Sequence, residues 1–251
     1  MAGVKALGFF SGVRAVFGGL GFVVTTPSAW GWALIPVVVA SLLFGGASAL
    51  TLWGGSALAI HIVGDAAGAA SGTWGGTFGV WMLKLLFWAI GLVIAFFVAM
   101  SLAQPLSGFA LDAIARKQEL ALGGRAWPDQ PLVAGAVRSL RVSLSALAIG
   151  LPILALLALV TLLVPPAGVV TVPLKFIVTG LLAAYDLLDY PLSQRGLSVR
   201  ERLAFMRRNF ASMLGFGVAM GALLLIPGVG LFLLPFGVAG ATRMVLDAEA
   251  K

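Results

Sequence analysis

The sequence contains no cysteine and a single histidine, His61. Disulfides, thiol nucleophiles and thiolate metal sites are therefore excluded. One imidazole without clustered partners does not make a metal site, so we expect His61 to be a loop residue. The motifs G-x-x-x-x-G-K-[ST] and H-E-x-x-H are absent, as is G-x-S-x-G with acid and histidine partners. We predict a protein that is not an enzyme and that needs no cofactor or metal.

Charge is also scarce. Only 10% of the residues are charged, 61% are hydrophobic, and the mean hydropathy is +1.08. Soluble domains carry about 25% charged residues, so this composition predicts an integral membrane protein. The net charge of +7 does not indicate nucleic-acid binding, because the basic residues fall in short segments beside apolar runs. We expect all 251 residues to form a single membrane domain.

Two apolar runs are long enough to cross a bilayer, which needs about 20 residues. Residues 25–28 supply helix-start chemistry for the first, which covers residues 32–53 between tryptophans and is expected to end near Trp53. The second covers residues 77–103. The linker at 54–77 is rich in glycine, alanine and serine and lacks lysine and arginine, which predicts a flexible loop on the outer face.

Four further apolar runs form two predicted helical hairpins. Residues 145–164 and 172–187 meet at a Pro-Pro-Ala-Gly turn, and residues 213–226 and 231–245 meet at Pro-Gly-Val-Gly. An arm of about 14 residues is about 21 Å long, shorter than the roughly 30 Å of hydrocarbon in a bilayer. We therefore predict an all-α membrane protein with two long transmembrane helices and two hairpins, of which at least the second penetrates only partly.

Polar segments complete the predicted architecture as amphipathic cytoplasmic helices. Residues 1–24 are expected to form an interfacial helix, and residues 106–141 a helix, a turn and a second helix. Residues 188–209 hold five arginines, and Ser198 with Glu201 has the spacing of a capping box. That box opens a helix whose Leu203, Met206 and Phe210 are expected to share one face.

The distribution of lysine and arginine predicts that both termini are cytoplasmic, because only Lys84 and Lys175 then face the outer side. Lys84 lies close to the outer end of its helix, so its ammonium should reach water. We expect Lys84 to be dispensable.

Several short motifs, in this order and spacing, are similar to those of the CysZ sulfate permease and etoposide-induced membrane protein family. They are Thr26-Pro27 with Leu34-Ile35-Pro36, Ala103-Gln104-Pro105-Leu106-Ser107-Gly108, Asp189-Tyr190-Pro191, Arg208-Asn209, Leu214-Gly215-Phe216-Gly217, Ile226-Pro227, Pro235 and Gly240-Ala241-Thr242. The resemblance implies a multi-pass protein of the bacterial inner membrane, assembled as a homo-oligomer and taking up sulfate for cysteine synthesis. It also implies structural roles for Pro27, Pro105, Asp189, Tyr190, Pro191, Asn209, Pro227, Gly240 and Thr242.

Two adjacent positions depart from that family. Its members carry a basic pair, associated with sulfate, where this chain has Trp30 and Gly31. Backbone N–H groups and the helix dipole at Thr26, Ser28 and Gly31 still predict an anion site there, with a plain helix cap as the alternative. Two functions stay open: a permease for sulfate or a related oxyanion, and a non-transporting membrane protein that organises lipid or envelope.

The Asp189-Tyr190-Pro191 motif is expected to end the second arm of the first hairpin, because proline disfavours helical geometry in the residue before it. Asp189 should pair with the arginines that follow, or alternatively titrate during transport. The basic cytoplasmic surface is expected to contact anionic lipid head groups through Arg195, Arg202, Arg207 and Arg208.

Overall fold

The computed structural model describes residues 7–66, 74–128, 131–226 and 230–250. Every regular element in these ranges is helical, and four helices are long and apolar enough to cross a membrane: Pro27–Ile62, Thr77–Leu106, Leu140–Leu163 and Pro165–Gln194. The chain divides into two compact units. One is Val37–Gln104, and the other combines Met1–Pro36 with Pro105–Lys251.

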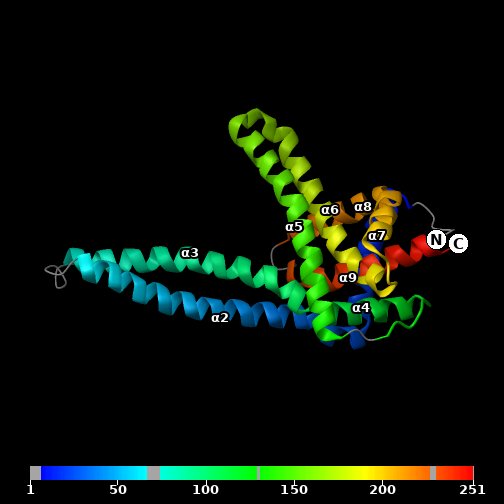
Figure 1. Ribbon diagram of the computed structural model, residues 1–251, viewed down its shortest axis with the longest axis horizontal. Coiled ribbons are helices and arrows are strands. Elements are labelled where there is room, and N and C mark those ends of the chain that lie inside the picture. Colours follow the sequence, from blue (N-terminus) through cyan, green and yellow to red (C-terminus); the bar gives the residue numbers. More distant parts are fainter. Residues whose placement is uncertain (1–6, 67–73, 129–130, 227–229, 251) are drawn as a thin grey trace. The chain divides into compact units, whose positions relative to one another are not determined.

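The first unit comprises residues 37–66 of α2 (Pro27–Ala66) and residues 74–104 of α3 (Trp74–Leu106), which run side by side (Figure 1). The predicted start is confirmed, since α2 opens at Pro27. The predicted end at Trp53 is wrong, and His61 lies in this helix rather than in a loop.

Contacts with α3 explain why the glycine-rich segment is helical. A Cβ placed on Gly55 would lie 3.2 Å from the Cβ of Phe87, and the indole Nε1 of Trp88 donates to the Leu52 carbonyl oxygen over 3.1 Å. Glycine there permits close packing, which overrides its low helix propensity. The flexible-loop prediction therefore fails for residues 54–66 and 74–77, and residues 67–73 lie outside the described ranges.

Lys84 has a local partner, because its Nζ lies 5.2 Å from the centre of the Trp81 ring. A cation over an indole contributes about 0.5–1 kcal/mol at an exposed site. Lys84→Met should therefore leave membrane yield unchanged and lower thermal stability in detergent only slightly. Trp81→Leu, which keeps the charge, should lower thermal stability further, because it also removes the edge-to-face contact of Trp81 with Trp88. A collapse in the membrane yield of Lys84→Met would contradict this prediction.

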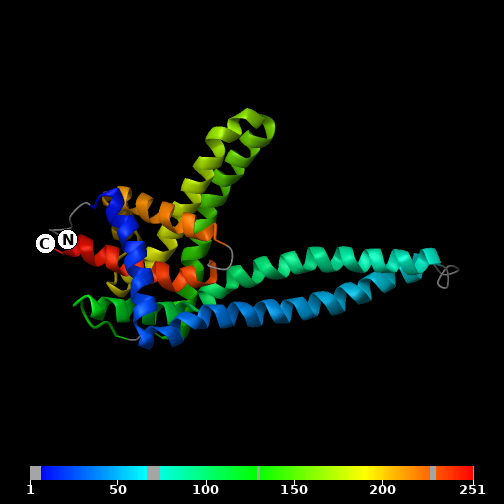
Figure 2. The same ribbon diagram turned by 180° about the vertical axis from the view of Figure 1, so that it is seen from behind.

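The second unit contains the first turns of α2, residues 27–36, together with the remaining helices (Figure 2). They are α1 (Phe9–Thr25), α4 (Gly108–Ala121), α5 (Leu132–Leu163), the 3-10 turn η1 (Pro165–Ala167), α6 (Gly168–Gln194), α7 (Val199–Arg208), α8 (Phe210–Leu224) and α9 (Gly230–Glu249). The predicted helix, turn and helix over 106–141 is confirmed, but its second helix continues into α5 without a break.

The hairpin of α5 and α6 turns at the predicted prolines, and polar side chains link its arms near the turn. The hydroxyls of Thr161 and Thr171 lie 2.6 Å apart, and Lys175 Nζ donates to Thr161 Oγ1 over 2.9 Å. The neutral hydroxyl oxygen of Thr161 thus solvates the ammonium of Lys175 near the turn of the hairpin.

Small residues let the helices of the second unit approach closely. The inward face of α1 carries Gly12, Ala15 and Gly19 and packs against α8 and α9, so this face contacts protein rather than the membrane interface that the sequence suggested. Where α6 crosses α8, a Cβ on Gly180 would lie 2.6 Å from the carbonyl oxygen of Gly217. Close helix packing is therefore the role of these glycines.

The prediction that Asp189-Tyr190-Pro191 ends a helix is wrong, since α6 continues through Pro191 to Gln194. Leu188, Tyr190 and Leu192 are each at most 2% exposed. Burial of these side chains in the core outweighs the local preference against helix before proline.

The capping box at the start of α7 is confirmed. The backbone N–H of Ser198 donates to Glu201 Oε2 over 2.8 Å, and the backbone N–H of Glu201 donates to Ser198 Oγ over 3.4 Å. The predicted shared apolar face is wrong in part, because Met206 is buried while Leu203 and Phe210 are exposed.

This box predicts a pH dependence of α7. The backbone N–H and then the hydroxyl of Ser198 hold the pKa of Glu201 below its ordinary 4.5. A carboxyl with a lowered folded-state pKa stabilises the helix above its unfolded pKa, and this contribution is lost as the pH falls through the folded value. Hydrogen exchange of the α7 amides, corrected for intrinsic rates, should therefore speed up below about pH 4.5.

Glu201→Gln is the control for this prediction, because an amide oxygen can still accept the Ser198 bond but does not titrate in this range. The variant should keep α7 protected and lose the pH dependence. Equal pH profiles in both proteins would show that Glu201 does not stabilise the helix.

Candidate functional site

The three residues predicted to attract an anion lie together at the corner between α1 and α2. The backbone N–H of Ala29 donates to the carbonyl oxygen of Thr26 over 2.9 Å, which closes the first turn of α2. Ser28 and Gly31 are exposed, and a Cβ on Gly31 would meet nothing within 4 Å. The corner thus presents an open helix N-terminus, where the helix dipole favours an anion.

Trp30 has a structural role at this corner that sequence reasoning missed. Its indole Nε1 donates to the carbonyl oxygens of Val23 and Val24, over 2.9 and 3.3 Å. These carbonyls belong to the last turn of α1, whose acceptors have no partner within the helix. The Trp30 side chain therefore fastens α1 to α2.

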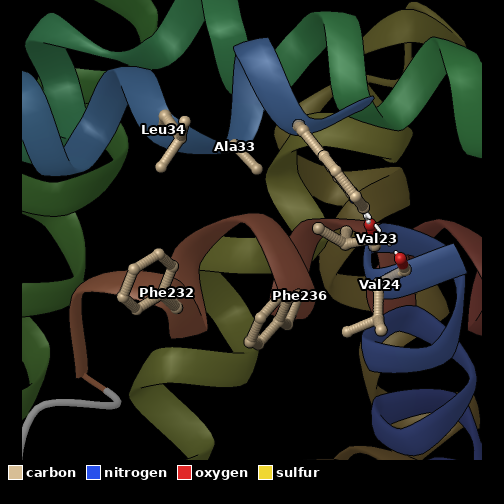
Figure 3. Close-up of a pocket in the computed structure, with 7 residues that line it drawn as sticks. Val23, Val24, Ala33, Leu34, Phe232 and Phe236 are labelled. Atoms are coloured by element: carbon tan, nitrogen blue, oxygen red, sulfur yellow. Dashed lines mark hydrogen bonds between the residues drawn. The ribbon is translucent and has the colours of Figure 1, made fainter. Parts of the chain in front are cut away.

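An apolar pocket of about 340 Å³ lies beside Trp30. Figure 3 shows Val23 and Val24 at the end of α1, Ala33 and Leu34 of α2, and Phe232 and Phe236 of α9 around it. The Phe232 and Phe236 rings are stacked, with centroids 6.4 Å apart. Among the described lining residues, the one side-chain N–H is that of Trp30, and it points to α1 carbonyls, so the pocket has no donor for an oxyanion.

A second cluster joins two carboxylates and two arginines from four helices. Arg138 of α5 donates through Nη2 to both oxygens of Asp112 in α4, each over 2.9 Å, and its Nε lies 3.4 Å from Oδ2 of Asp189 in α6. Arg202 of α7 forms a hydrogen-bonded ion pair with Asp189. The predicted pairing of Asp189 with a following arginine is thus confirmed. We call these four residues the Asp-Arg cluster.

The Asp-Arg cluster is shielded from water. The Asp112 and Asp189 side chains are 3% and 7% exposed, and those of Arg138 and Arg202 are 17% and 19% exposed. Burial raises the pKa of the Asp112 carboxyl, and the guanidinium of Arg138 opposes that rise. The two guanidinium groups and the two carboxylates of the cluster pair with one another across four helices, so the cluster holds these helices together.

Arg195 does not belong to an exposed basic surface, contrary to the prediction. Its guanidinium is 6% exposed and donates to Glu119 over 2.9 Å and to Glu249 over 2.6 Å. It also lies 5.6 Å from the centre of the Trp127 ring. Ion pairs with these two carboxylates and the contact with the Trp127 ring stabilise the Arg195 guanidinium in its buried position. Arg202 is half-buried in the Asp-Arg cluster, so of the four predicted surface arginines only Arg207 and Arg208 are exposed.

Four other motif residues lie in the packed interior, whereas Pro27 is exposed at the start of α2. Asn209 is fully buried, accepts from the backbone N–H of Leu7 over 3.1 Å and donates to the Phe205 carbonyl. Thr242 is also buried and donates to the Val238 carbonyl over 2.9 Å. Gly240 packs on the backbone of α1, and Pro105 is buried at the end of α3. Pro227 lies outside the described residues.

Comparison with known proteins agrees with the motifs. Residues 15–235 match the family described as sulfate transporter CysZ/etoposide-induced protein 2.4. The chain is 34% identical over 182 residues to proteins named sulfate transporter CysZ from Pseudomonas paraeruginosa and Pseudomonas aeruginosa, covering 68% of this chain and 70% of each relative. It is 32% identical to a protein of the same name from Vibrio cholerae over 84 residues, covering 33% of this chain and 34% of the relative. The chain therefore belongs to the family of sulfate transporter CysZ and etoposide-induced protein 2.4.

Proposed function

We propose that this protein is a permease for sulfate or a related oxyanion in the inner (cytoplasmic) membrane of a bacterium, where it supplies sulfur for cysteine synthesis. The observation that carries the proposal is the family match over residues 15–235, together with relatives named sulfate transporter CysZ. Four helices long and apolar enough to cross a membrane are consistent with this role.

The proposed anion contact is the open N-terminus of α2, through Thr26, Ser28 and Gly31. Ser28 and Gly31 are exposed, and the partial positive charge of a helix N-terminus attracts anions without a basic side chain. Arg138, Arg195 and Arg202 are less suitable as anion ligands, because each is already paired with a carboxylate. We therefore expect the N-terminus of α2 to bind an anion more weakly than a site with two basic side chains would.

The proposal includes an orientation with both termini in the cytoplasm, a single membrane domain and a homo-oligomer. The orientation is supported by the positive-inside rule, which leaves only Lys84 and Lys175 on the outer side. The oligomer is supported by the family resemblance and by the large number of exposed apolar side chains on the long helices.

Purified protein in liposomes tests the function. Sulfate flux should exceed that of empty vesicles, should saturate with sulfate concentration and should fall when competing oxyanions are added. Ser28→Ala should reduce flux, whereas Ser56→Ala, on α2 far from its N-terminus, should not. Flux equal to that of empty vesicles under several ion gradients would refute the permease.

A second candidate is a non-transporting membrane protein of the same family that organises lipid or envelope. It is favoured by the apolar pocket beside Trp30, because that pocket offers no donor to an anion. A strain that lacks the protein separates the two functions. Normal growth on sulfate as the sole sulfur source would support the second candidate.

A further inference from the structure

A cation, Arg243, lies further along α9 on the helix face that lines the apolar pocket. Phe232, Phe236 and Arg243 are spaced by four and seven residues, so they share one face of that helix. Seven residues correspond to about 10 Å along a helix. The Arg243 side chain crosses α1 at Gly18, where a Cβ would lie 2.8 Å from its Cδ and Nη1. Pocket and guanidinium therefore lie along the same contact between α1 and α9.

Arg243 has charge available for a ligand. Within the described ranges no carboxylate forms an ion pair with it, although Asp247 lies one turn further along α9. Arg14 of α1 is exposed and lies one turn before Gly18, so it adds a second positive charge at this end of the contact. The surface thus has an apolar end at Trp30 and Phe236 and a basic end at Arg14 and Arg243.

We propose that this surface binds one anionic phospholipid, with an acyl chain in the apolar pocket and the phosphate at Arg243 and Arg14. The pocket volume of about 340 Å³ falls within the roughly 300–1,000 Å³ of small-molecule sites, and its lining is apolar and aromatic as a hydrocarbon chain requires. Guanidinium groups bind phosphate with two parallel hydrogen bonds.

The basic end and the apolar end also match how a lipid lies in a leaflet. If both chain termini are cytoplasmic, Arg14 and Arg243 lie nearer the cytoplasmic surface than the pocket does, because α9 runs from the pocket toward its C-terminus. Anionic lipids are enriched in that leaflet and attract basic side chains there. A sulfate ion would use only the basic end, so the apolar end favours a lipid. The inference does not depend on transport.

Native mass spectrometry of the purified full chain tests this site. Phosphatidylglycerol and phosphatidylcholine with identical acyl chains are the probes, because they share the tail and differ in net charge. The wild type should retain phosphatidylglycerol about tenfold more tightly. Arg243→Gln should abolish this preference. Arg207→Gln, which removes an exposed arginine of α7, should behave as the wild type.

The acyl-chain end is tested with Val24→Trp, which places a larger side chain at an exposed position of the pocket wall, and with Leu34→Ser, which places a hydroxyl there. Both should weaken binding of both lipids by about tenfold. Thermal unfolding in detergent reports whether Val24→Trp and Leu34→Ser fold. If these two variants do not fold, Arg243→Gln still tests the site.

Three results would overturn the proposal. Equal retention of the two lipids by the wild type would exclude a headgroup site. An equal loss in Arg207→Gln and Arg243→Gln would assign the preference to overall charge. A dimer that dissociates in Val24→Trp would show that a second copy of the chain occupies the pocket. Absence of sulfate flux would not affect these three results, since they measure lipid retention and oligomeric state.

Discussion

Asp189→Asn should destabilise the protein by about 3–5 kcal/mol, the usual cost of removing one partner from a buried ion pair. The Asp189 side chain is 7% exposed and contacts Arg138 and Arg202, whose side chains are 17% and 19% exposed. Asparagine keeps the shape but removes the charge, so Arg202 loses its carboxylate and Arg138 loses one of its two carboxylates and keeps Asp112. Thermal unfolding in detergent should show a large fall in melting temperature.

Asp247→Asn is the matched control for this prediction, because Asp247 is exposed and is not one of the carboxylates that pair with Arg138 and Arg202. It should melt as the wild type does. Arg202→Gln combined with Asp189→Asn should cost less than the two single changes summed, since they remove the same ion pair. If Asp189→Asn melts normally but loses sulfate flux, Asp189 acts as a transport carboxylate and the structural account is wrong.

Gly180→Leu should prevent the protein from reaching its folded state in useful yield. The backbones of α6 and α8 touch at Gly180 and Gly217, where even a methyl group would lie 2.6 Å from a carbonyl oxygen. A backbone atom cannot rotate away as a flexible side chain can. Gly180→Ala should cost about 1–3 kcal/mol, as overpacking of a close contact does.

Gly21→Ala is the control, because this glycine-to-alanine change should raise stability rather than lower it. Gly21 lies within α1, and a Cβ there would meet nothing within 4 Å. Alanine is favoured over glycine inside a helix by about 1 kcal/mol, so this variant should melt at or above the wild-type temperature. If Gly180→Ala and Gly21→Ala lowered the melting temperature equally, the loss of glycine flexibility, and not the contact between α6 and α8, would explain the destabilisation.

Local chemistry in the sequence was enough to place several helix ends. Pro27 opens α2, Ser198 and Glu201 open α7, and the prolines at 165 and 166 turn the hairpin of α5 and α6. Each of these signals acts within a few residues of itself. The predicted helix ends were wrong where contacts between residues distant in the sequence determine the structure. Trp88 of α3 packs on the glycine-rich part of α2, and burial in the core keeps α6 helical through Pro191.

In the candidate sites too, the sequence predicted local contacts but not contacts between residues distant in the chain. Asp189 was expected to pair with a nearby arginine, and Arg202 lies 13 residues away along the chain. The partner of Arg195 in α4 is Glu119, 76 residues away, and periodicity contains no information about such a pair. The pocket beside Trp30 is assembled from three helices, so no single stretch of sequence predicts it.

The length of α2 has a consequence for how it lies in a bilayer. Its apolar part, Pro27–Ile62, has 36 residues and is therefore about 54 Å long. The hydrocarbon layer is only about 30 Å thick, and transmembrane helices rarely tilt by more than about 40°. At that tilt a 54 Å helix still rises about 41 Å, close to the full thickness of a bilayer with its head groups. Hydrophobic mismatch should therefore hold α2 at a steep tilt, and bilayers of longer-chain lipids should bring it closer to the membrane normal.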